Sequence, residues 1–385
     1  MGCTDAHVEL NGFEGTVTIN EPVLRCPGNP ILTCHEVNKV WGTDSRLYTY
    51  TVHNAGMAAV TDANGRNQIV MLFRSHIADG RSVIGKAVSS NGLDNWIIEP
   101  RPFLLPATKK DVYAEGIDID YVIESEAGGV EDIRANPVGN GLYVLTYSAY
   151  HEQIPDRVKV MMAVTSDFKT VVRYGPVSGQ DMRNVVIFPE PDKNKRWRAL
   201  LRPNDKSREL SGSGHIGGSF GEICAGFAPS PIGPWEIGNV IMRSGHGPGA
   251  FQAKIGPGAP PIKTRYGWLN IFHGVRSTMA GNPYTLGVAF HELEDPADPG
   301  KIRISSKPVL MPGANDCLVR DTDYVHVPDV VFCCGVLTGK DDTIAIYYGG
   351  NDTVMNVGLS NIQILNEMCD VFRLDPLTGK HLYSL

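Results

Sequence analysis

Residues 131–147 read EDIRANPVGNGLYVLTY, and this stretch predicts a β-hairpin. An apolar run follows a turn rich in Gly, Pro and Asn, and these residue types favour tight turns between strands. Two adjacent carboxylates, Glu131 and Asp132, open the stretch. Because neighbouring side chains on a strand point to opposite faces, we expect only one of the two acids to face a common site.

Four further segments follow the same pattern, each with a short strand, a turn of Gly, Asn, Asp or Lys, and a second strand. A third strand follows each of the five at a variable distance. Long amphipathic helical patterns are scarce between them. A unit of three or four strands, repeated five times, predicts an all-β fold and a five-bladed β-propeller. The five segments are residues 54–74, 131–147, 183–202, 258–273 and 328–348.

The bulk composition sets limits on the class of protein. We expect the 385 residues to form one domain, 1–385, with an N-terminal extension of about 25 residues. A net charge of -7 argues against nucleic acid as a partner, and no apolar run reaches the length of a membrane span. The eight Cys form no pair of CxxC motifs, and no basic-then-apolar leader is visible. Reduced thiols, a cytoplasmic location and no zinc site are expected.

In each repeat, an apolar run forms the second strand. A polar residue lies five positions after the first residue of that run. In a propeller, equivalent positions of successive blades form a ring about the axis, so these residues are expected near one end of a central funnel. Arg and His suit an anion, and Tyr suits the face or a hydroxyl of a sugar. The alternative is that each residue ends its strand in solvent. The five residues are Arg74, Tyr147, Arg202, His273 and Tyr348.

Two other stretches invite a site assignment. Residues 211–222, SGSGHIGGSFGE, resemble a phosphate-binding glycine loop, but no helical pattern follows. We expect a loop at the funnel mouth instead, with His215 as a sugar contact. The acidic residues 111–126 are expected to form a loop between the first two repeats, and they lack an EF-hand pattern. No metal site is predicted.

Short motifs occur in a fixed order along the chain. They are GNPILT (28–33), NAGM (54–57), VEDIR (130–134), TSDF (165–168), NVVIFPE (184–190), LLRP (200–203), PPIKTRYGWLNIFHGV (260–275), YTLGVAF (284–290), VPDVVF (327–332) and IYYGGNDT (346–353). In the order and placement of these motifs the chain resembles glycoside hydrolase family 130, the inverting β-mannoside phosphorylases, which are five-bladed propellers. The resemblance covers roughly residues 25 to 365.

The resemblance implies that Asp132 is the proton donor, a choice that strand alternation alone leaves open between Asp132 and Glu131. An inverting hydrolase needs an acid, a base and a water between them. A phosphorylase replaces the base and the water with inorganic phosphate, so one carboxylate and a set of cations opposite it suffice. In this family the donor passes its proton through a mannose hydroxyl to the glycosidic oxygen.

The resemblance also implies a phosphate site. Lys254 and His273 match the family's Lys and His, which lie nineteen residues apart, with Lys263 as a rival cation. The two Arg after the donor strand are assigned to Arg157 first and Arg173 second, although relatives have Arg where this chain has Ala149 and Tyr150. Arg202 fits a sugar or phosphate contact. The expected substrate contacts are Asn54, Arg74, Glu131, Arg134, Tyr147, Tyr150, His215, Asp329 and Tyr348.

The function implied is reversible phosphorolysis of a β-mannoside, with β-1,2-linked mannooligosaccharides favoured and α-mannose 1-phosphate as the product. Phosphate is a co-substrate, and no cofactor is expected. Relatives in this direction include protozoan enzymes of a β-1,2-mannan called mannogen. The alternatives are a sugar-nucleotide mannosyltransferase, a β-mannosidase and a non-catalytic glycan-binding propeller. The cations argue against the mannosidase, and a retained acid argues against simple binding. The oligomeric state is left open.

Overall fold

The structure, a computed structural model, describes residues 5–42, 44–61, 65–154, 157–204, 221–244, 249–279, 281–317 and 327–382. Within these ranges the chain is mostly β, as predicted from the sequence. The strands form five antiparallel meanders, numbered here 1 to 5 along the chain, and each contains one of the predicted hairpins.

Meander 1 consists of β4 (His53–Thr61), β5 (Asn67–His76), β6 (Ser82–Ser89) and β7 (Ile97–Ile98). Meander 2 consists of β9 (Gly129–Pro137), β10 (Tyr143–Tyr150), β11 (Val158–Thr165) and β12 (Val172–Pro176), with β8 (Val112–Tyr113) beside β12. Meander 3 consists of β13 (Met182–Ile187), β14 (Trp197–Pro203), β15 (Ile223–Ala228) and β16 (Glu236–Met242).

Meander 4 consists of β17 (Lys254–Pro257), β18 (Ile262–Thr264), β19 (Gly267–Val275), β20 (Tyr284–His291) and β21 (Arg303–Ser305), with β25 (Arg373–Leu374) at its edge. Meander 5 consists of β22 (Val331–Thr338), β23 (Thr343–Gly350), β24 (Val354–Asn361) and β3 (Leu24–Arg25).

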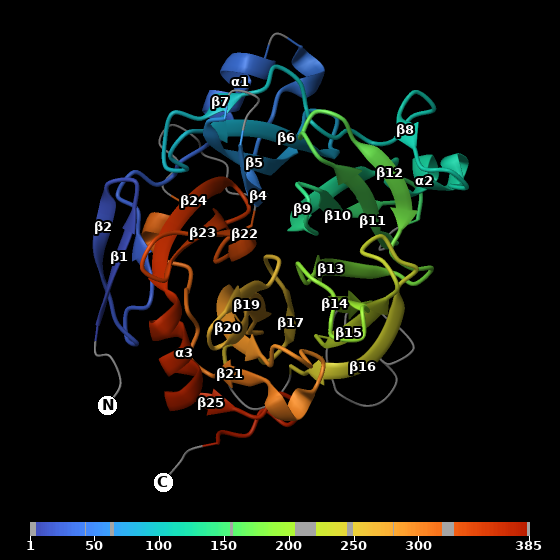
Figure 1. Cartoon of the computed structure of the whole chain (residues 1–385). Helices are drawn as coiled ribbons and strands as arrows, with labels where there is room; N and C mark the ends of the chain where they lie inside the picture. The colour runs from blue at the N-terminus through green and yellow to red at the C-terminus, as the bar shows by residue number, and fades with distance from the viewer. Residues whose placement is uncertain are drawn as a thin grey trace.

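The five meanders lie around a common centre, with the first strand of each innermost (Figure 1). Their connections are local, and a single pairing, Ser82 with Gly129, joins meanders 1 and 2 into one sheet. Since the first strands converge, residues from all five meanders can reach one central site.

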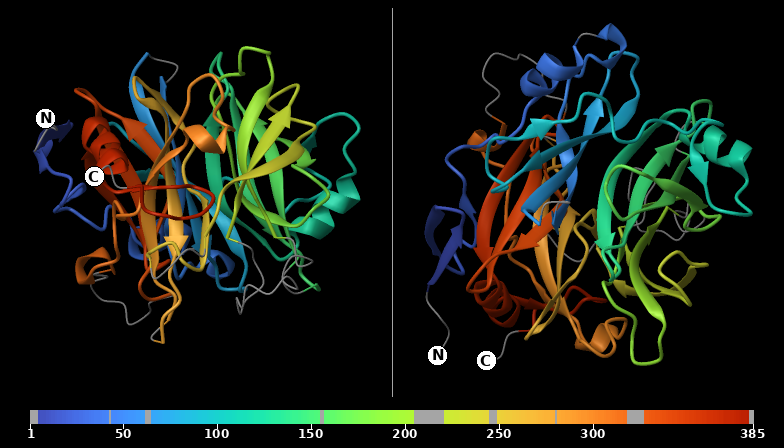
Figure 2. Two further views of the ribbon diagram at one scale, coloured as in Figure 1. Left: turned by 90° about the horizontal axis from the view of Figure 1, so that it is seen from below. Right: turned by 45° about the horizontal axis from the view of Figure 1, so that its top comes forward.

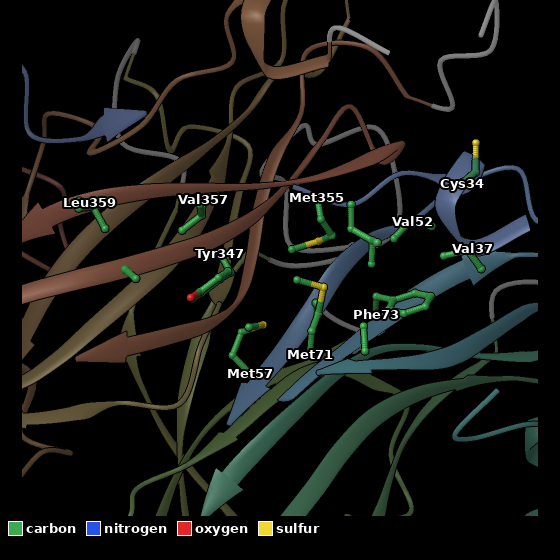
Figure 3. Packing of buried hydrophobic residues seen from close by; sticks show 14 of the residues in the cluster. Cys34, Val37, Val52, Met57, Met71, Phe73, Tyr347, Met355, Val357 and Leu359 are labelled. Atoms are coloured by element: carbon green, nitrogen blue, oxygen red, sulfur yellow. The ribbon is translucent and has the colours of Figure 1, made fainter. Parts of the chain in front are cut away.

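The apolar core is divided among the interfaces between consecutive meanders. Alternate side chains of each strand face the two neighbouring sheets, as the period of two requires. Figure 3 shows the cluster between meanders 5 and 1, where Met71 and Phe73 of β5 lie opposite Met355 and Val357 of β24. Comparable clusters fill the other four interfaces.

The N-terminal segment takes part in the last meander. Strand β3 pairs with β24, so residues that precede meander 1 complete meander 5. The hairpin of β1 (Ala6–Leu10) and β2 (Phe13–Val17) lies beside the same meander, and the two ends of the chain lie on the same side (Figures 1 and 2). The predicted extension therefore contributes one strand, β3, to the repeated architecture.

Three α-helices lie in the described ranges: α1 (Cys34–Trp41), α2 (Ile119–Glu126) and α3 (Ile362–Val371). Helix α2 corrects the expectation of a loop over 111–126, because Asp118 caps its first turn and its apolar residues Val122 and Ile123 pack against meander 2. None of the described helices combines the length and apolar character that crossing a membrane requires.

Candidate active site

A cavity of about 160 Å³ lies where the inner strands of the five meanders converge. Every meander contributes at least one side chain to its wall. Ten polar or charged residues line it together with three apolar ones from meander 5. The lining residues are Asn54, Arg74, Asp132, Arg183, Asn184, Arg202, Lys254, His273, Tyr284, Val327, Val330, Phe332 and Asp352.

A repeated β-bulge aims three of these side chains at the cavity. Asn54, Asp132 and Asn184 occupy matching places in β4, β9 and β13, with φ of 49°, 49° and 56°. Each lies where the pairing with the second strand shifts register. Bulges re-aim side chains, and Asn and Asp tolerate the left-handed conformation better than other non-glycine residues. Short polar residues at this position are therefore a local requirement of the backbone.

The carboxylate of Asp132 is held from two sides. Its Oδ1 accepts hydrogen bonds from Asn54 Nδ2 at 3.0 Å and from Arg74 Nη1 at 3.1 Å. Its backbone carbonyl accepts from Arg134 Nη1 at 2.5 Å. Because both side-chain bonds end on Oδ1, Oδ2 is the oxygen of Asp132 suited to exchange a proton with a ligand.

Glu131 also reaches Arg74, but it does not line the cavity. Its Oε1 accepts from Arg74 Nη2 at 2.7 Å and from Ser82 Oγ at 2.9 Å. Burial would raise the pKa of Glu131, yet the Arg74 charge outweighs it and lowers the pKa to about 2. A carboxylate that stays ionised is a poor proton donor, and the expected role of Glu131 as a substrate contact is replaced by that of an anchor for Arg74.

A second acid of the cavity, Asp352, was not identified from the sequence. It lies in the turn between β23 and β24 with φ of 47°. Its Oδ1 lies 3.4 Å from Asn54 Nδ2, so one amide touches both Asp132 and Asp352. Burial raises the pKa of Asp352 to about 6, with Arg74 opposing and the Asp132 charge adding to the shift.

Four nitrogen-bearing side chains form a cluster on the wall made by meanders 3 and 4: Arg183, Arg202, Lys254 and His273. Arg183 and Arg202 pair across β13 and β14. Arg202 Nη1 lies 3.3 Å from His273 Nε2. Lys254 Nζ lies 4.8 Å from the ring centre of Tyr284, and Arg183 lies 5.2 Å above that of Tyr150.

The cations of this cluster weaken one another's charge. Burial and then Arg202 and Arg183 lower the pKa of Lys254 to about 7. Burial and then Arg183 lower that of Arg202 to about 10. No carboxylate of the described ranges forms an ion pair with Arg202 or Lys254. Crowded cations without a paired acid are stabilised when an anion enters.

His273 is neutral in this cluster. Burial, together with Arg202, lowers its pKa well below the ordinary value. Since an arginine can only donate, His273 Nε2 is the acceptor of the Arg202 contact. Gly256 makes the close packing possible, because a Cβ at that position would lie 2.5 Å from the His273 ring and 3.1 Å from the Arg202 side chain.

The predicted ring of five polar residues is correct for three members. Arg74, Arg202 and His273 line the cavity, whereas Tyr147 and Tyr348 do not. The strand register explains the position of Tyr147. Arg74 pairs with His53 and Arg202 pairs with Arg183, in each case with the residue just before the bulge. In meander 2 the residue in that place is Ser148, which pairs with Glu131. Tyr147 is therefore one residue out of step and points to the opposite face of its sheet.

The structure places Tyr147 and Arg173, which the sequence assigns to the substrate and to phosphate, away from the cavity. Both side chains belong to a buried network around Glu126 of α2. Tyr147 donates to Glu126 Oε1 at 2.8 Å, and Arg173 Nη1 pairs with Glu126 Oε2 at 2.5 Å. Arg173 also donates to the carbonyl of Leu105. This network attaches α2 to meander 2, away from the cavity.

Arg134 and Tyr348 are likewise structural. Arg134 is 1% exposed, and its guanidinium donates to the carbonyls of Asp132 and Gly258, beneath the cavity. Tyr348 donates to Asp316 Oδ1 at 2.8 Å, and Arg25 holds the same carboxylate at 2.7 Å. Neither expected substrate contact reaches the cavity wall.

The remaining predicted residues differ in their placement. Arg157 follows β10 and Asp329 precedes β22, and neither is among the lining residues. Asp329 instead accepts the backbone N–H of Tyr284 through its carbonyl. Tyr150 lies at the cavity margin through its contact with Arg183. His215 lies outside the described residues.

Arg183, Asn184, Tyr284 and Asp352 are the polar lining residues that sequence reasoning missed. A signal for Arg183 was present: Arg183 and Arg202 are 19 residues apart, as are Lys254 and His273 in the next repeat. Both pairs join the start of a first strand to the end of a second. In the described ranges, no group of three or more His, Cys, Asp or Glu is arranged to hold a metal ion.

Comparison with known proteins gives a consistent family. Residues 234–373 match the family model Glyco_hydro_130, described as beta-1,4-mannooligosaccharide phosphorylase. The chain is 28% identical over 370 residues to a 4-O-beta-D-mannosyl-D-glucose phosphorylase of Bacteroides fragilis, covering 91% of this chain and 87% of that one. It is 27% identical over 279 residues to a 1,2-beta-oligomannan phosphorylase of Thermoanaerobacter, covering 72% and 78%.

A solved structure supports the same grouping at the level of the fold. The beta-1,2-mannobiose phosphorylase of Listeria innocua superposes with a TM-score of 0.69 and 22% identity, covering 91% of this chain and 99% of that one. The family match, the curated relatives and this fold agree with the motifs seen in the sequence. Over residues 234–373 the chain matches the glycoside hydrolase family 130 model, and over longer stretches it is similar to curated mannoside phosphorylases.

Proposed function

We propose that the five meanders form a single five-bladed β-propeller and that the chain is an inverting phosphorylase of β-mannosides. The observation that carries the proposal is the division of one cavity into two walls. Asp132 and Arg74 lie on meanders 1 and 2 and form the acid wall. The cluster of Arg183, Arg202, Lys254 and His273 lies on meanders 3 and 4 and forms the cation wall. An acid opposite an anion site is the arrangement that phosphorolysis with inversion needs.

In the proposed reaction, a phosphate oxygen held by Arg183, Arg202 and Lys254 attacks the anomeric carbon of the terminal mannose. The glycosidic C–O bond breaks on the opposite face, and the proton of Asp132 reaches the leaving oxygen, through a mannose hydroxyl as the family resemblance implies. The proton that phosphate releases on forming the ester restores Asp132. The products are α-mannose 1-phosphate and a saccharide shortened by one unit.

Two further residues have roles in this proposal. Asn54 orients Asp132 and touches Asp352 with the same amide. Asp352, whose pKa is raised to about 6 by burial, accepts hydrogen bonds from hydroxyls of the mannose held between the walls. Both residues would therefore act on the sugar that is transferred.

The relatives support a mannoside as the substrate but differ in linkage. Their names include 1,2-beta-oligomannan, beta-1,2-mannobiose, 4-O-beta-D-mannosyl-D-glucose and beta-1,4-mannooligosaccharide phosphorylases. We propose β-1,2-linked mannooligosaccharides, as favoured by the sequence motifs. A cytoplasmic location, independence of a cofactor and kinship with the protozoan group stay predictions from the sequence.

The test is an incubation with β-1,2- and β-1,4-mannobiose, each with and without inorganic phosphate, followed by ³¹P and ¹H NMR. We expect α-mannose 1-phosphate only when phosphate is present. Equal release of free mannose without phosphate would make the chain a β-mannosidase. Turnover only with a sugar nucleotide would make it a mannosyltransferase, and binding without turnover would make it a glycan-binding protein.

A further inference from the structure

The segment before β4 carries two exposed tyrosines beside the acid wall. Tyr48 and Tyr50 are 48% and 46% exposed, and their rings meet edge to face with centres 5.5 Å apart. Single exposed aromatic residues are common on protein surfaces, but an ordered pair is a ready-made apolar surface. The proposed reaction gives this tyrosine pair no role.

Hydrogen bonds fix this segment along the end of β5. The N–H of Tyr50 donates to the carbonyl of His76 at 2.9 Å. Thr49 Oγ1 donates to the same carbonyl at 2.9 Å, and Thr51 Oγ1 accepts from the N–H of His76 at 3.1 Å. Thr49 and Thr51 are fully buried, so Tyr48 and Tyr50, which alternate with them, face solvent.

A short chain of contacts leads from these tyrosines to the proposed proton donor. His76 Nε2 lies 2.9 Å from Arg74 Nη2, and Arg74 Nη1 donates to Asp132 at 3.1 Å. The tyrosine pair therefore belongs to the same side of the molecule as Asp132. The cluster of Arg183, Arg202, Lys254 and His273 lines the same cavity from meanders 3 and 4.

The stereochemistry of the proposed reaction predicts which part of the substrate lies on this side of the cavity. Inversion requires the incoming phosphate and the departing saccharide to lie on opposite faces of the transferred sugar. With phosphate on meanders 3 and 4, the departing saccharide extends over meander 1. A pyranose ring has an apolar face of C–H groups and a rim of hydroxyls, which match the face and the hydroxyl of tyrosine.

We propose that Tyr48 and Tyr50 form a binding platform for the departing part of a mannooligosaccharide, beyond the sugar unit next to the cleaved bond. This inference rests on the proposed function for the direction of departure. It assigns the chain a substrate class, oligosaccharides of three or more units, and a residue pair that favours them over disaccharides.

The experiment compares a disaccharide with a tetrasaccharide of the same linkage at saturating phosphate. The double substitution Tyr48→Ala/Tyr50→Ala should raise KM for the tetrasaccharide by about five- to thirtyfold, because it removes two aromatic contacts. KM for the disaccharide, KM for phosphate and kcat should stay within about twofold. Tyr48→Phe/Tyr50→Phe should recover most of the loss, since it keeps the rings.

The matched control is Ile97→Ala, which removes an exposed apolar side chain from β7 and should change no KM. Equal effects of the double substitution on both substrates, or none on either, would overturn the platform. The platform would also be overturned if the double substitution changed the oligomeric state, seen by size-exclusion chromatography, and left KM unchanged. That result would assign the tyrosines to an interface between copies.

A binding measurement separates this inference from the proposed function. Calorimetric titration of the tetrasaccharide is done in an Asp132→Asn background, so that no turnover intervenes. Tighter binding of the tetrasaccharide than of the disaccharide, abolished by the double alanine substitution, would support the platform even if the wild-type chain performs no phosphorolysis. Phosphorolysis with no tyrosine-dependent difference in binding would leave the proposed function standing and refute the platform.

Discussion

The two walls of the cavity hold their charges in opposite ways. On meanders 1 and 2, Arg74 donates a hydrogen bond to Glu131 and another to Asp132. On meanders 3 and 4, Arg202 and Lys254 have no acid partner within the described ranges. Burial and the charge of Arg183 lower the pKa of Arg202, and burial, Arg202 and Arg183 lower the pKa of Lys254. The first wall pairs its charges within the protein, whereas the second is the one that we propose to bind an anion.

The network around Glu126 is a third region, in which a buried charge is paired with an opposite charge. Arg173, Glu126 and Tyr147 form a closed network in which the Arg charge meets a carboxylate. Breaking such a network costs stability, because it leaves a buried charge unpaired. Arg202 and Lys254, which form no ion pair with an acid of the described residues, therefore fit the proposed anion site, whereas Arg173 is held by a structural network.

The largest effect is expected at the acid wall. Asp132→Asn removes the proposed proton source and should lower kcat by about a hundred- to ten-thousandfold. Asn tolerates the φ of 49° at this bulge, so the fold should be preserved, as circular dichroism would verify. Near-normal kcat in this variant, with a loss in Glu131→Gln, would transfer the role to Glu131.

At the cation wall, Lys254→Ala should weaken phosphate binding by about ten- to a hundred-and-fiftyfold, since a hydrogen bond to a charged group contributes about 1.5 to 3 kcal/mol. Steady-state kinetics with phosphate as the varied substrate would measure this, and KM for the mannoside should change little. Lys263→Ala is the matched control, because Lys263 pairs with Glu190 at a separate surface groove. A larger effect of the control would reverse the assignment.

The pH dependence of phosphate use should reflect the crowding of the cations. With its pKa lowered to about 7, Lys254 is protonated below that pH and loses its charge as pH rises. kcat/KM for phosphate should therefore fall by roughly fivefold between pH 7 and 8. Lys254→Arg should remove this limb and retain any contribution from phosphate ionisation. An unchanged profile in that variant would exclude Lys254 as the titrating group.

The smallest effect on activity is expected in the Glu126 network. Tyr147→Phe removes two buried hydrogen bonds, one donated to Glu126 and one accepted from Arg173. It should lower the free energy of unfolding by about 1 to 3 kcal/mol, measured by urea denaturation. Its kcat and both KM values should equal those of the wild type. A tenfold loss of kcat would return Tyr147 to the active site and would contradict the register that separates it from Ser148.

The sequence predicted the repeated hairpins because turn residues and apolar runs act locally. It also identified Asp132, Lys254 and His273 through family motifs, and Arg74 and Arg202 through the shared position in the second strands; the structure places all five on the cavity wall. It did not predict helix α2, because the capping residue Asp118 is one of several acidic residues in the same stretch. Nor did it identify Asp352, which reaches the cavity from a turn of the last meander.

By itself, then, the sequence determined the class of fold, its repeat and the chemical types gathered at the centre. Only the tertiary structure decided which side chains face that centre. The reason is that a strand has a period of two and a bulge shifts it by one residue, so Tyr147 and Ser148 exchange faces without any change in composition. The separation into an acid wall and a cation wall likewise required the meanders to be placed around one axis, because its members come from distant parts of the chain.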